Sequence, residues 1–296
     1  MAAIHEAAAL IRGGGIVAIP TETVYGLAAD ARDSAAVARI YAAKGRPSFN
    51  PLIVHVPDAA AAERIAVFDD DARALAAAFW PGPLTLVLPI RAGAGIASLA
   101  TAGLDTVAVR VPAHRAMQAL LAASAAPLAA PSANASNAIS PTRAAHVAAS
   151  LGASVPLIVD DGSTTAGVES TIVAGRTILR PGPVTAEMLR EILPVAPGTS
   201  AHISAPGQLA THYAPRKPLR LDAVAADDDE WLIGFGSVAG DDMLSATGDM
   251  VEAAARLFDA LHRADASDRS RIAVAPVPEQ DIGAAINDRL RRAAAR

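Results

Sequence analysis

Short apolar runs alternate with helical patterns along most of this chain, and no other feature of the sequence restricts its fold as much. An apolar run of about five residues between turn formers is typical of a buried strand, whereas apolar residues three or four apart indicate a helix that covers a sheet. We expect strands at residues 16–19, 52–56, 84–89, 106–111, 156–159, 170–173, 177–179, 231–235 and 271–277, and a further apolar segment at 127–130. We expect helices at residues 34–43, with Ser34 as the N-cap, and at 70–79, 114–122, 186–193, 250–264 and 282–293. The pattern predicts an α/β protein whose sheet mixes parallel and antiparallel neighbours.

Length and composition narrow the class further. The chain has 296 residues, of which 52% are hydrophobic and 19% charged, so a disordered tail is excluded and two domains are expected. The absence of cysteine excludes a disulfide scaffold, a thiolate zinc site and a cysteine nucleophile. Pro81, Pro83 and Pro127 interrupt the most apolar stretches, and Glu6 stands where a signal peptide would be basic. We therefore expect a cytoplasmic protein that does not enter a membrane.

A basic linker divides the chain. Residues 201–220 carry Arg216, Lys217 and Arg220 and no acidic residue, and the surrounding sequence is rich in Pro, Gly, Ser and Thr. We expect a larger domain over residues 1–198, a linker over 199–220 and a small C-terminal α/β domain over 221–296. Gly234 and Gly236 follow a predicted strand there, but the third glycine of the dinucleotide fingerprint is missing. The net charge of −5 argues against strong nucleic-acid binding.

The first polar cluster of interest is Thr21, Glu22 and Thr23, which follow the first predicted strand directly. In open α/β sheets, ligands bind at such strand ends. A hydrogen-bonded turn with Glu22 in solvent is the alternative.

The second cluster contains Lys44 and Arg46, which are separated by one glycine. In an extended conformation the two side chains leave the same side of the backbone and form a compact dication that suits a polyphosphate. The alternative is a cationic helix C-terminus stabilised by the macrodipole. His55, inside an apolar run, is either a core residue or a ligand-binding one.

Charges and small polar residues also stand at the ends of later strands. Arg110 and Arg180 each end an apolar strand, which indicates an anion at the strand edge, and Thr106 faces the same side as Arg110. Residues 131–142 form a run of Ser, Asn and Thr that either cradles phosphate and ribose or simply connects elements. Phosphate-loop, HExxH and nucleophile-elbow motifs are absent. The cations interleaved with Ser, Thr and Asn predict a cleft for a small, highly anionic substrate.

The chain resembles the YrdC-like family, specifically its two-domain threonylcarbamoyl-AMP synthases, through nine motifs in order: PTETVYGL, KGRP, NPLIVHV, TVAVRVP, APSANAS, ISPT, GVESTIV, ILRPG and THYAP. The resemblance runs from about Gly14 to Pro218 and resumes at residues 284–292. It implies a twisted open mixed sheet with flanking helices and a smaller Rossmann-like C-terminal domain. It further implies a nucleotidyltransferase that makes threonylcarbamoyl-AMP and pyrophosphate from L-threonine, bicarbonate and ATP, with Mg²⁺. The product would pass to the machinery that forms N6-threonylcarbamoyladenosine in tRNA.

The resemblance also assigns roles to residues. Four would surround threonine, namely Thr23, His55, Arg110 and Ser170. The ATP site would comprise Lys44, Arg46, Asn50, Thr106, Ser132, Asn134, Ser140, Arg180 and, from the linker, Tyr213, with Lys44 and Arg46 as the catalytic pair. No residue of the chain is expected to bind a metal.

Elementary electrostatics agrees with this assignment. A carbamate and a triphosphate are both anions, so bringing them together requires several fixed cations. Catalysis would then be mainly positioning and charge stabilisation, without a protein nucleophile.

Two departures from the family pattern matter. Asn137 stands where glycine is common, and asparagine is one of the few other residues that tolerate the left-handed conformation. The C-terminal domain is shorter than in relatives, and it either closes the site or contacts a partner. The competing hypotheses are an RNA-binding module without synthase activity and a hydrogenase-maturation carbamoyltransferase, although the latter carries cysteine zinc modules that are absent from this chain.

Overall fold

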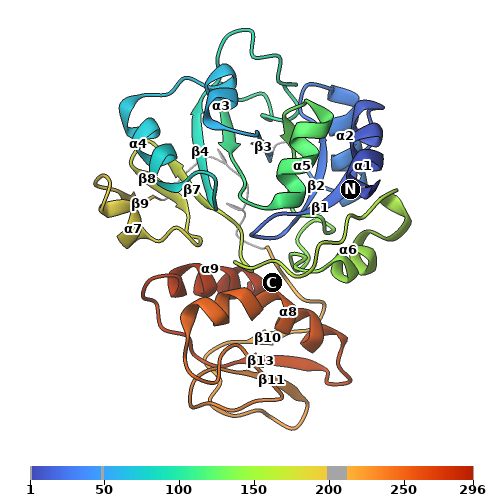
Figure 1. Ribbon diagram of the computed structural model, residues 1–296. Coiled ribbons are helices and arrows are strands. Elements are labelled where there is room, and N and C mark those ends of the chain that lie inside the picture. Colours follow the sequence, from blue (N-terminus) through green and yellow to red (C-terminus); the bar gives the residue numbers. More distant parts are fainter. Residues whose placement is uncertain (1, 48–49, 199–211, 296) are drawn as a thin grey trace.

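The computed structural model describes residues 2–47, 50–198 and 212–295, which form two β-sheets with their helices. Figure 1 shows the larger sheet in the upper half of the molecule and the smaller one below it, with helices α8 and α9 between them. The expectations that fall on residues 199–211 lie outside the described residues.

The larger sheet has nine strands in the order β1-β2-β6-β3-β5-β4-β7-β8-β9. These are β1 (Val17–Pro20), β2 (Tyr25–Asp30), β3 (Ile53–His55), β4 (Leu84–Pro89), β5 (Thr106–Arg110), β6 (Leu128–Ala129), β7 (Thr171–Ala174), β8 (Thr177–Arg180) and β9 (Ala196–Pro197). β3 runs parallel to β5, β4 to β7 and β8 to β9, while the other neighbouring pairs are antiparallel. The predicted mixed sheet is therefore confirmed.

Helices cover both faces of this sheet. They are α1 (Ala2–Arg12), α2 (Ser34–Lys44), α3 (Ala59–Ile65), α4 (Asp70–Phe79), α5 (Arg115–Ser124), α6 (Ala144–Leu151) and α7 (Ala186–Arg190), with a 3₁₀ turn at Gly152–Ser154. Successive residues of β1 point to opposite faces: Val17 and Ile19 pack with α1 and α5, whereas Ala18 packs with the core under α2, α3 and α4. Because both faces are buried, the strand is apolar throughout instead of alternating.

The smaller sheet contains β10 (Leu219–Arg220), β11 (Glu230–Gly234), β12 (Asp242–Met243) and β13 (Arg271–Val274), in the order β10-β13-β11-β12 with all neighbours parallel. Helices α8 (Met250–Ala266) and α9 (Gly283–Ala294) pack on it. Their core also takes in Val24, Ile139, Val168 and Tyr213 from the segments that border the larger sheet. The two halves of the molecule thus share buried apolar contacts.

Most expected elements are present, but three details differ. Asp33, not Ser34, caps α2, because its side chain accepts the backbone N–H groups of Ala35 and Ala36. The strand expected at residues 156–159 is reduced to a single bridge between Ile158 and Ala18. Seven elements were not expected from the sequence, namely β2, β9, β10, β12, α1, α3 and α6.

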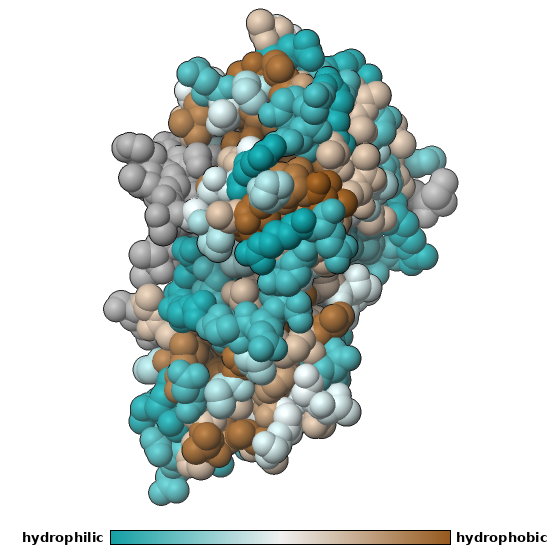
Figure 2. All heavy atoms as spheres, turned by 90° about the vertical axis from the view of Figure 1, so that its left-hand side faces the viewer, coloured by the Kyte–Doolittle hydropathy of each residue, from teal (hydrophilic) through white to brown (hydrophobic). Residues whose placement is uncertain are grey.

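The surface is mixed in character. Figure 2 shows hydrophobic side chains in separate patches between hydrophilic ones on the face that it presents. Within the described ranges, every helix is too short or too polar to cross a bilayer.

Candidate active site

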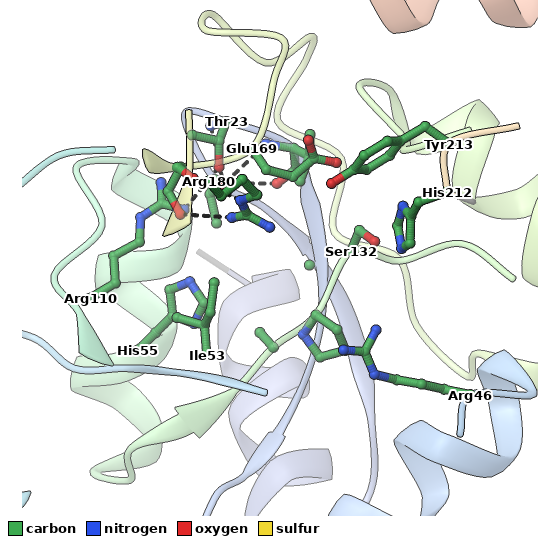
Figure 3. Close-up of a pocket in the computed structure, with 16 residues that line it drawn as sticks. Thr23, Arg46, Ile53, His55, Arg110, Ser132, Glu169, Arg180, His212 and Tyr213 are labelled. Atoms are coloured by element: carbon green, nitrogen blue, oxygen red, sulfur yellow. Dashed lines mark hydrogen bonds between the residues drawn. The ribbon is translucent and has the colours of Figure 1, made fainter. Parts of the chain in front are cut away.

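A pocket opens among the strand ends of the larger sheet and is bordered on one side by His212 and Tyr213 (Figure 3). Its lining comes from segments far apart in sequence: Thr21, Thr23, Val24, Gly26, Arg46, Ile53, His55, Arg110, Ala130, Pro131, Ser132, Glu169, Ser170, Arg180, His212 and Tyr213. Figure 3 shows Arg110 and His55 on one side of the pocket and His212 and Tyr213 on the opposite side.

One end of the pocket is organised by Arg110, the last residue of β5. Its Nη2 lies 2.7 Å from Glu22 Oε1, its Nη1 donates to Thr23 Oγ1 at 3.0 Å, and its Nε donates to the carbonyl of Gly82 at 3.2 Å. Burial raises the pKa of Glu22, but Arg110 outweighs it and the net shift is downward. Glu22 is therefore an ionised partner of Arg110 and not a solvated side chain, although the hydrogen-bonded turn considered from the sequence does form, since Thr21 Oγ1 accepts the backbone N–H groups of Thr23 and Val24.

His55 sits beside Arg110, because β3 and β5 are parallel and place the two residues in register. The histidine side chain is buried, and burial together with the adjacent guanidinium lowers its pKa to about 3. Its Nδ1 has no hydrogen-bond partner among the described residues. His55 is thus both a buried residue and a pocket residue, and it is neutral at physiological pH.

Ser170 forms the next part of the wall, and two neighbours hold it. Its Oγ lies 2.7 Å from Thr85 Oγ1, and Arg180 donates to its carbonyl at 3.0 Å and to its Oγ at 3.2 Å. Arg180 is the last residue of β8. It is 4% exposed and lines the pocket.

Lys44 does not form the extended dication with Arg46 that the spacing predicted. It ends helix α2, and Gly45 follows with φ 59° in the left-handed region, which turns the chain between the two cations. The buried Lys44 Nζ donates to the carbonyls of Ser132 (2.5 Å) and Asn134 and to Asn134 Oδ1 (3.3 Å). Burial and Arg46 lower its pKa, but three oxygen acceptors match the three donors of the ammonium form. Lys44 therefore supports the loop behind the pocket instead of lining it.

Arg46, by contrast, reaches the pocket and is half-buried. It donates to the carbonyls of Asn50 at 3.3 Å and Pro51 at 3.0 Å. Burial lowers its pKa to about 10, so it stays charged at neutral pH.

The polar loop at residues 131–142 folds around Lys44. Asn134 Nδ2 donates to the carbonyl of Ala138 at 2.7 Å, and Ser140 Oγ donates to Glu169 Oε1. Asn137 has φ 67°, so this asparagine adopts the left-handed conformation that asparagine tolerates better than most residues. Ser132 lines the pocket directly, whereas Asn134 and Ser140 are not among its lining residues.

Tyr213, near the start of the part of the linker that the structure describes, lines the pocket. It is 1% exposed, adopts φ 64°, and packs against His212 with ring centroids 4.0 Å apart. Its hydroxyl has no hydrogen-bond partner among the described residues, and the same holds for His212 Nδ1 and Asn50 Oδ1. Buried polar atoms without partners are rare in folded proteins and are expected where a ligand completes the site.

Thr106 is a predicted site residue that lies away from the pocket. It begins β5, whose other end carries Arg110, and it does not line the pocket. Conversely, Glu22 and Glu169 were not predicted as site residues, although each lay inside a polar cluster that the sequence singled out. Among the described residues, no group of three or more His, Cys, Asp or Glu side chains could hold a metal ion.

Comparisons with known proteins show the family of the chain. Residues 9–182 match the Sua5–YciO–YrdC family, described as telomere recombination, and residues 184–295 match the threonylcarbamoyl-AMP synthase C-terminal domain. The chain is 41% identical to threonylcarbamoyl-AMP synthase of Pyrococcus abyssi, across 98% of this chain and 93% of that protein, and 39% identical to the Bacillus subtilis enzyme of the same name, across 98% and 92%. The crystal structure of P. abyssi Sua5 with L-threonine superposes with a TM-score of 0.90 at 38% identity, covering 98% of this chain and 94% of that one.

Proposed function

This chain belongs to the threonylcarbamoyl-AMP synthase family, and from that premise we propose that its basic pocket makes threonylcarbamoyl-AMP and pyrophosphate from L-threonine, bicarbonate and ATP. Three guanidinium groups, from Arg46, Arg110 and Arg180, converge on this pocket from distant parts of the chain. That convergence is the observation that carries the proposal, because three cations beside so few acidic groups call for an anionic ligand.

Threonine binds at the Arg110 end. The P. abyssi structure with L-threonine supports this ligand, and the residues assigned to it are Thr23, His55, Arg110 and Ser170. A guanidinium suits the amino-acid carboxylate, while a neutral His55 adds no further positive charge beside the threonine amine. That amine must be unprotonated to react.

ATP binds at the opposite end, against Arg46, Ser132, Arg180 and Tyr213. Lys44, Asn50, Asn134 and Ser140 hold this wall from behind, and Lys44 acts by shaping the loop. Thr106 belongs to the ATP site only by family resemblance. Mg²⁺ enters as part of the substrate, on the phosphate oxygens of ATP, which are the hard ligands that it prefers.

The reaction needs little covalent help from the protein. The threonine nitrogen adds to the bicarbonate carbon with loss of water and gives a carbamate. A carbamate oxygen then attacks the α-phosphorus, the bond to the bridging oxygen breaks, and pyrophosphate leaves. Arg46, Arg110 and Arg180 offset the repulsion between the two anions and stabilise charge on the phosphorus in the transition state. We place this reaction in the cytoplasm, with tRNA threonylcarbamoyl-transferase enzymes as the users of the product.

The test is pyrophosphate release by the full chain. We expect release from ATP only when both threonine and bicarbonate are present, and serine or glycine in place of threonine serves as the control for substrate choice. Equal release without threonine or without bicarbonate would refute the proposal, and tight, steeply salt-dependent RNA binding by a chain without this activity would favour the RNA-binding alternative.

A further inference from the structure

Helix α9 buries one positive charge completely. Arg289 is 0% exposed, and its guanidinium is surrounded by four oxygen atoms. Its Nε lies 3.0 Å from Glu169 Oε2, its Nη2 donates to the carbonyl of Glu169 at 3.3 Å, and its Nη1 donates to the carbonyl of Pro181 at 2.7 Å and to Asp288 Oδ2 at 3.0 Å. A buried charge with this many charge-assisted hydrogen bonds holds its partners in fixed positions.

The two segments that Arg289 joins flank a pair of pocket residues. Glu169 precedes Ser170 and Pro181 follows Arg180, and Arg180 is itself hydrogen-bonded to Ser170. The segments are already in close contact, since a Cβ at Gly182 would lie 2.7 Å from the Glu169 carbonyl oxygen. A displacement of either segment would therefore move the Arg180 guanidinium.

Arg289 reaches the proposed nucleotide side by two further routes. Glu169, held by Arg289, accepts the hydrogen bond of Ser140. The Arg289 guanidinium carbon also lies 5.4 Å from the centroid of the Tyr213 ring, within cation–π range. Figure 1 shows why one helix can do both, because α9 lies at the boundary between the two halves of the molecule.

The threonine end of the pocket is held by other residues. Arg110 is fixed by Glu22, Thr23 and Gly82, and Ser170 has Thr85 as an additional partner. Loss of Arg289 would thus leave this end largely in place.

We propose that Arg289 is a positioning residue for the ATP side of the active site, so that the C-terminal part of the chain sets the geometry of nucleotide binding. This inference rests on the function proposed above. Arg289 lines no part of the pocket and acts through Glu169, Pro181 and Tyr213.

The test compares ligand affinities of the full chain by isothermal titration calorimetry. For Arg289→Met we expect the Kd for ATP to rise by about tenfold or more and the Kd for L-threonine to change by less than about threefold. Arg291→Met is the matched control, because Arg291 lies on the same helix but is exposed and pairs with Glu279, and it should change neither Kd. An unchanged Kd for ATP, or an equal rise for both ligands, would overturn the inference. A wild-type chain that binds neither ligand would refute the proposed function instead.

A second variant covers the case in which Arg289→Met does not fold. Arg289→Lys keeps the charge and most of the volume, but an ammonium group cannot span Glu169 and Pro181 as the planar guanidinium does. We expect the same selective rise in the Kd for ATP, smaller in size, at a melting temperature close to that of the wild type. If Arg289→Lys weakens both ligands equally or neither of them, Arg289 has only a general structural role.

Discussion

Arg46 and Arg110 have different interaction partners. This difference predicts which guanidinium group is not neutralised by a carboxylate and can bind an anionic substrate. Arg110 forms an ion pair with Glu22. Arg46 donates to the carbonyls of Asn50 and Pro51 and interacts with the Tyr41 hydroxyl, and no acidic side chain in the described part of the chain forms an ion pair with it. Carbonyl dipoles orient the guanidinium but leave its net charge in place. Arg46 is therefore the cation best suited to meet the triphosphate.

For Arg46→Ala we expect turnover to fall by about 100-fold, the scale of losing one preorganised charge-stabilising group. Arg46 is half-buried, so the melting temperature should fall slightly while the fold is retained. Steady-state pyrophosphate release and thermal melting measure the two effects. Arg32→Ala, at an exposed arginine paired with Asp30, is the control and should leave turnover unchanged. Wild-type turnover in Arg46→Ala would exclude it from the reaction.

At the scale of elements, helix α8 supports the polar loop through a histidine. The ring of His262 stacks on that of His146 from α6, with centroids 3.8 Å apart, and its Nε2 lies 3.1 Å from the carbonyl oxygen of Ser140. Burial and then His146 lower the pKa of His262 to about 4, while Asp259 and Asp265 oppose the shift. The native state therefore holds this histidine neutral in a contact between α8 and the site loop.

This contact should make stability depend on pH. The unfolded chain takes up a proton near the ordinary pKa of 6.5, whereas the native state resists it down to about 4, so the free energy of unfolding should decrease as the pH falls between these values. Replacing His262 by Gln should flatten that slope in urea denaturation curves. His5→Gln, at an exposed position on α1, is the control. If His262→Gln and the wild type show the same slope, His262 is not held neutral.

The sequence predicts elements well where one local signal dominates. β4 and α4 begin and end at the predicted residues, because Pro83 and the Asp69–Asp71 cluster mark their starts. β2 was missed because hydroxyl groups and a carboxylate precede it and the stretch was interpreted as a ligand-binding cluster. Its pairing with β1 is local, whereas its pairing with β6 is not. α1, α3 and α6 are rich in alanine, which contributes little periodic contrast to a helical pattern.

For the whole molecule, the cations of the site were predictable but their contacts were not. Arg46, Arg110 and Arg180 each end or follow an element, and the structure brings them to one pocket. Lys44 does not line the pocket, since the left-handed Gly45 turns the chain directly after it. The ion pair between Glu169 and Arg289 joins positions 120 residues apart. The spacing of residues along the sequence does not indicate such long-range pairs. The domain boundaries at residues 198 and 220 remain a prediction.

The most direct test of the proposed reaction follows the carbon atom of bicarbonate into the product. The full chain is incubated with ATP, L-threonine and ¹³C-bicarbonate, and the adenylate product is identified by mass spectrometry. We predict threonylcarbamoyl-AMP that carries the labelled carbon, formed in equal amount with pyrophosphate and lost when threonine is omitted. Pyrophosphate formed without a labelled adenylate would show that the converging arginines serve a different reaction.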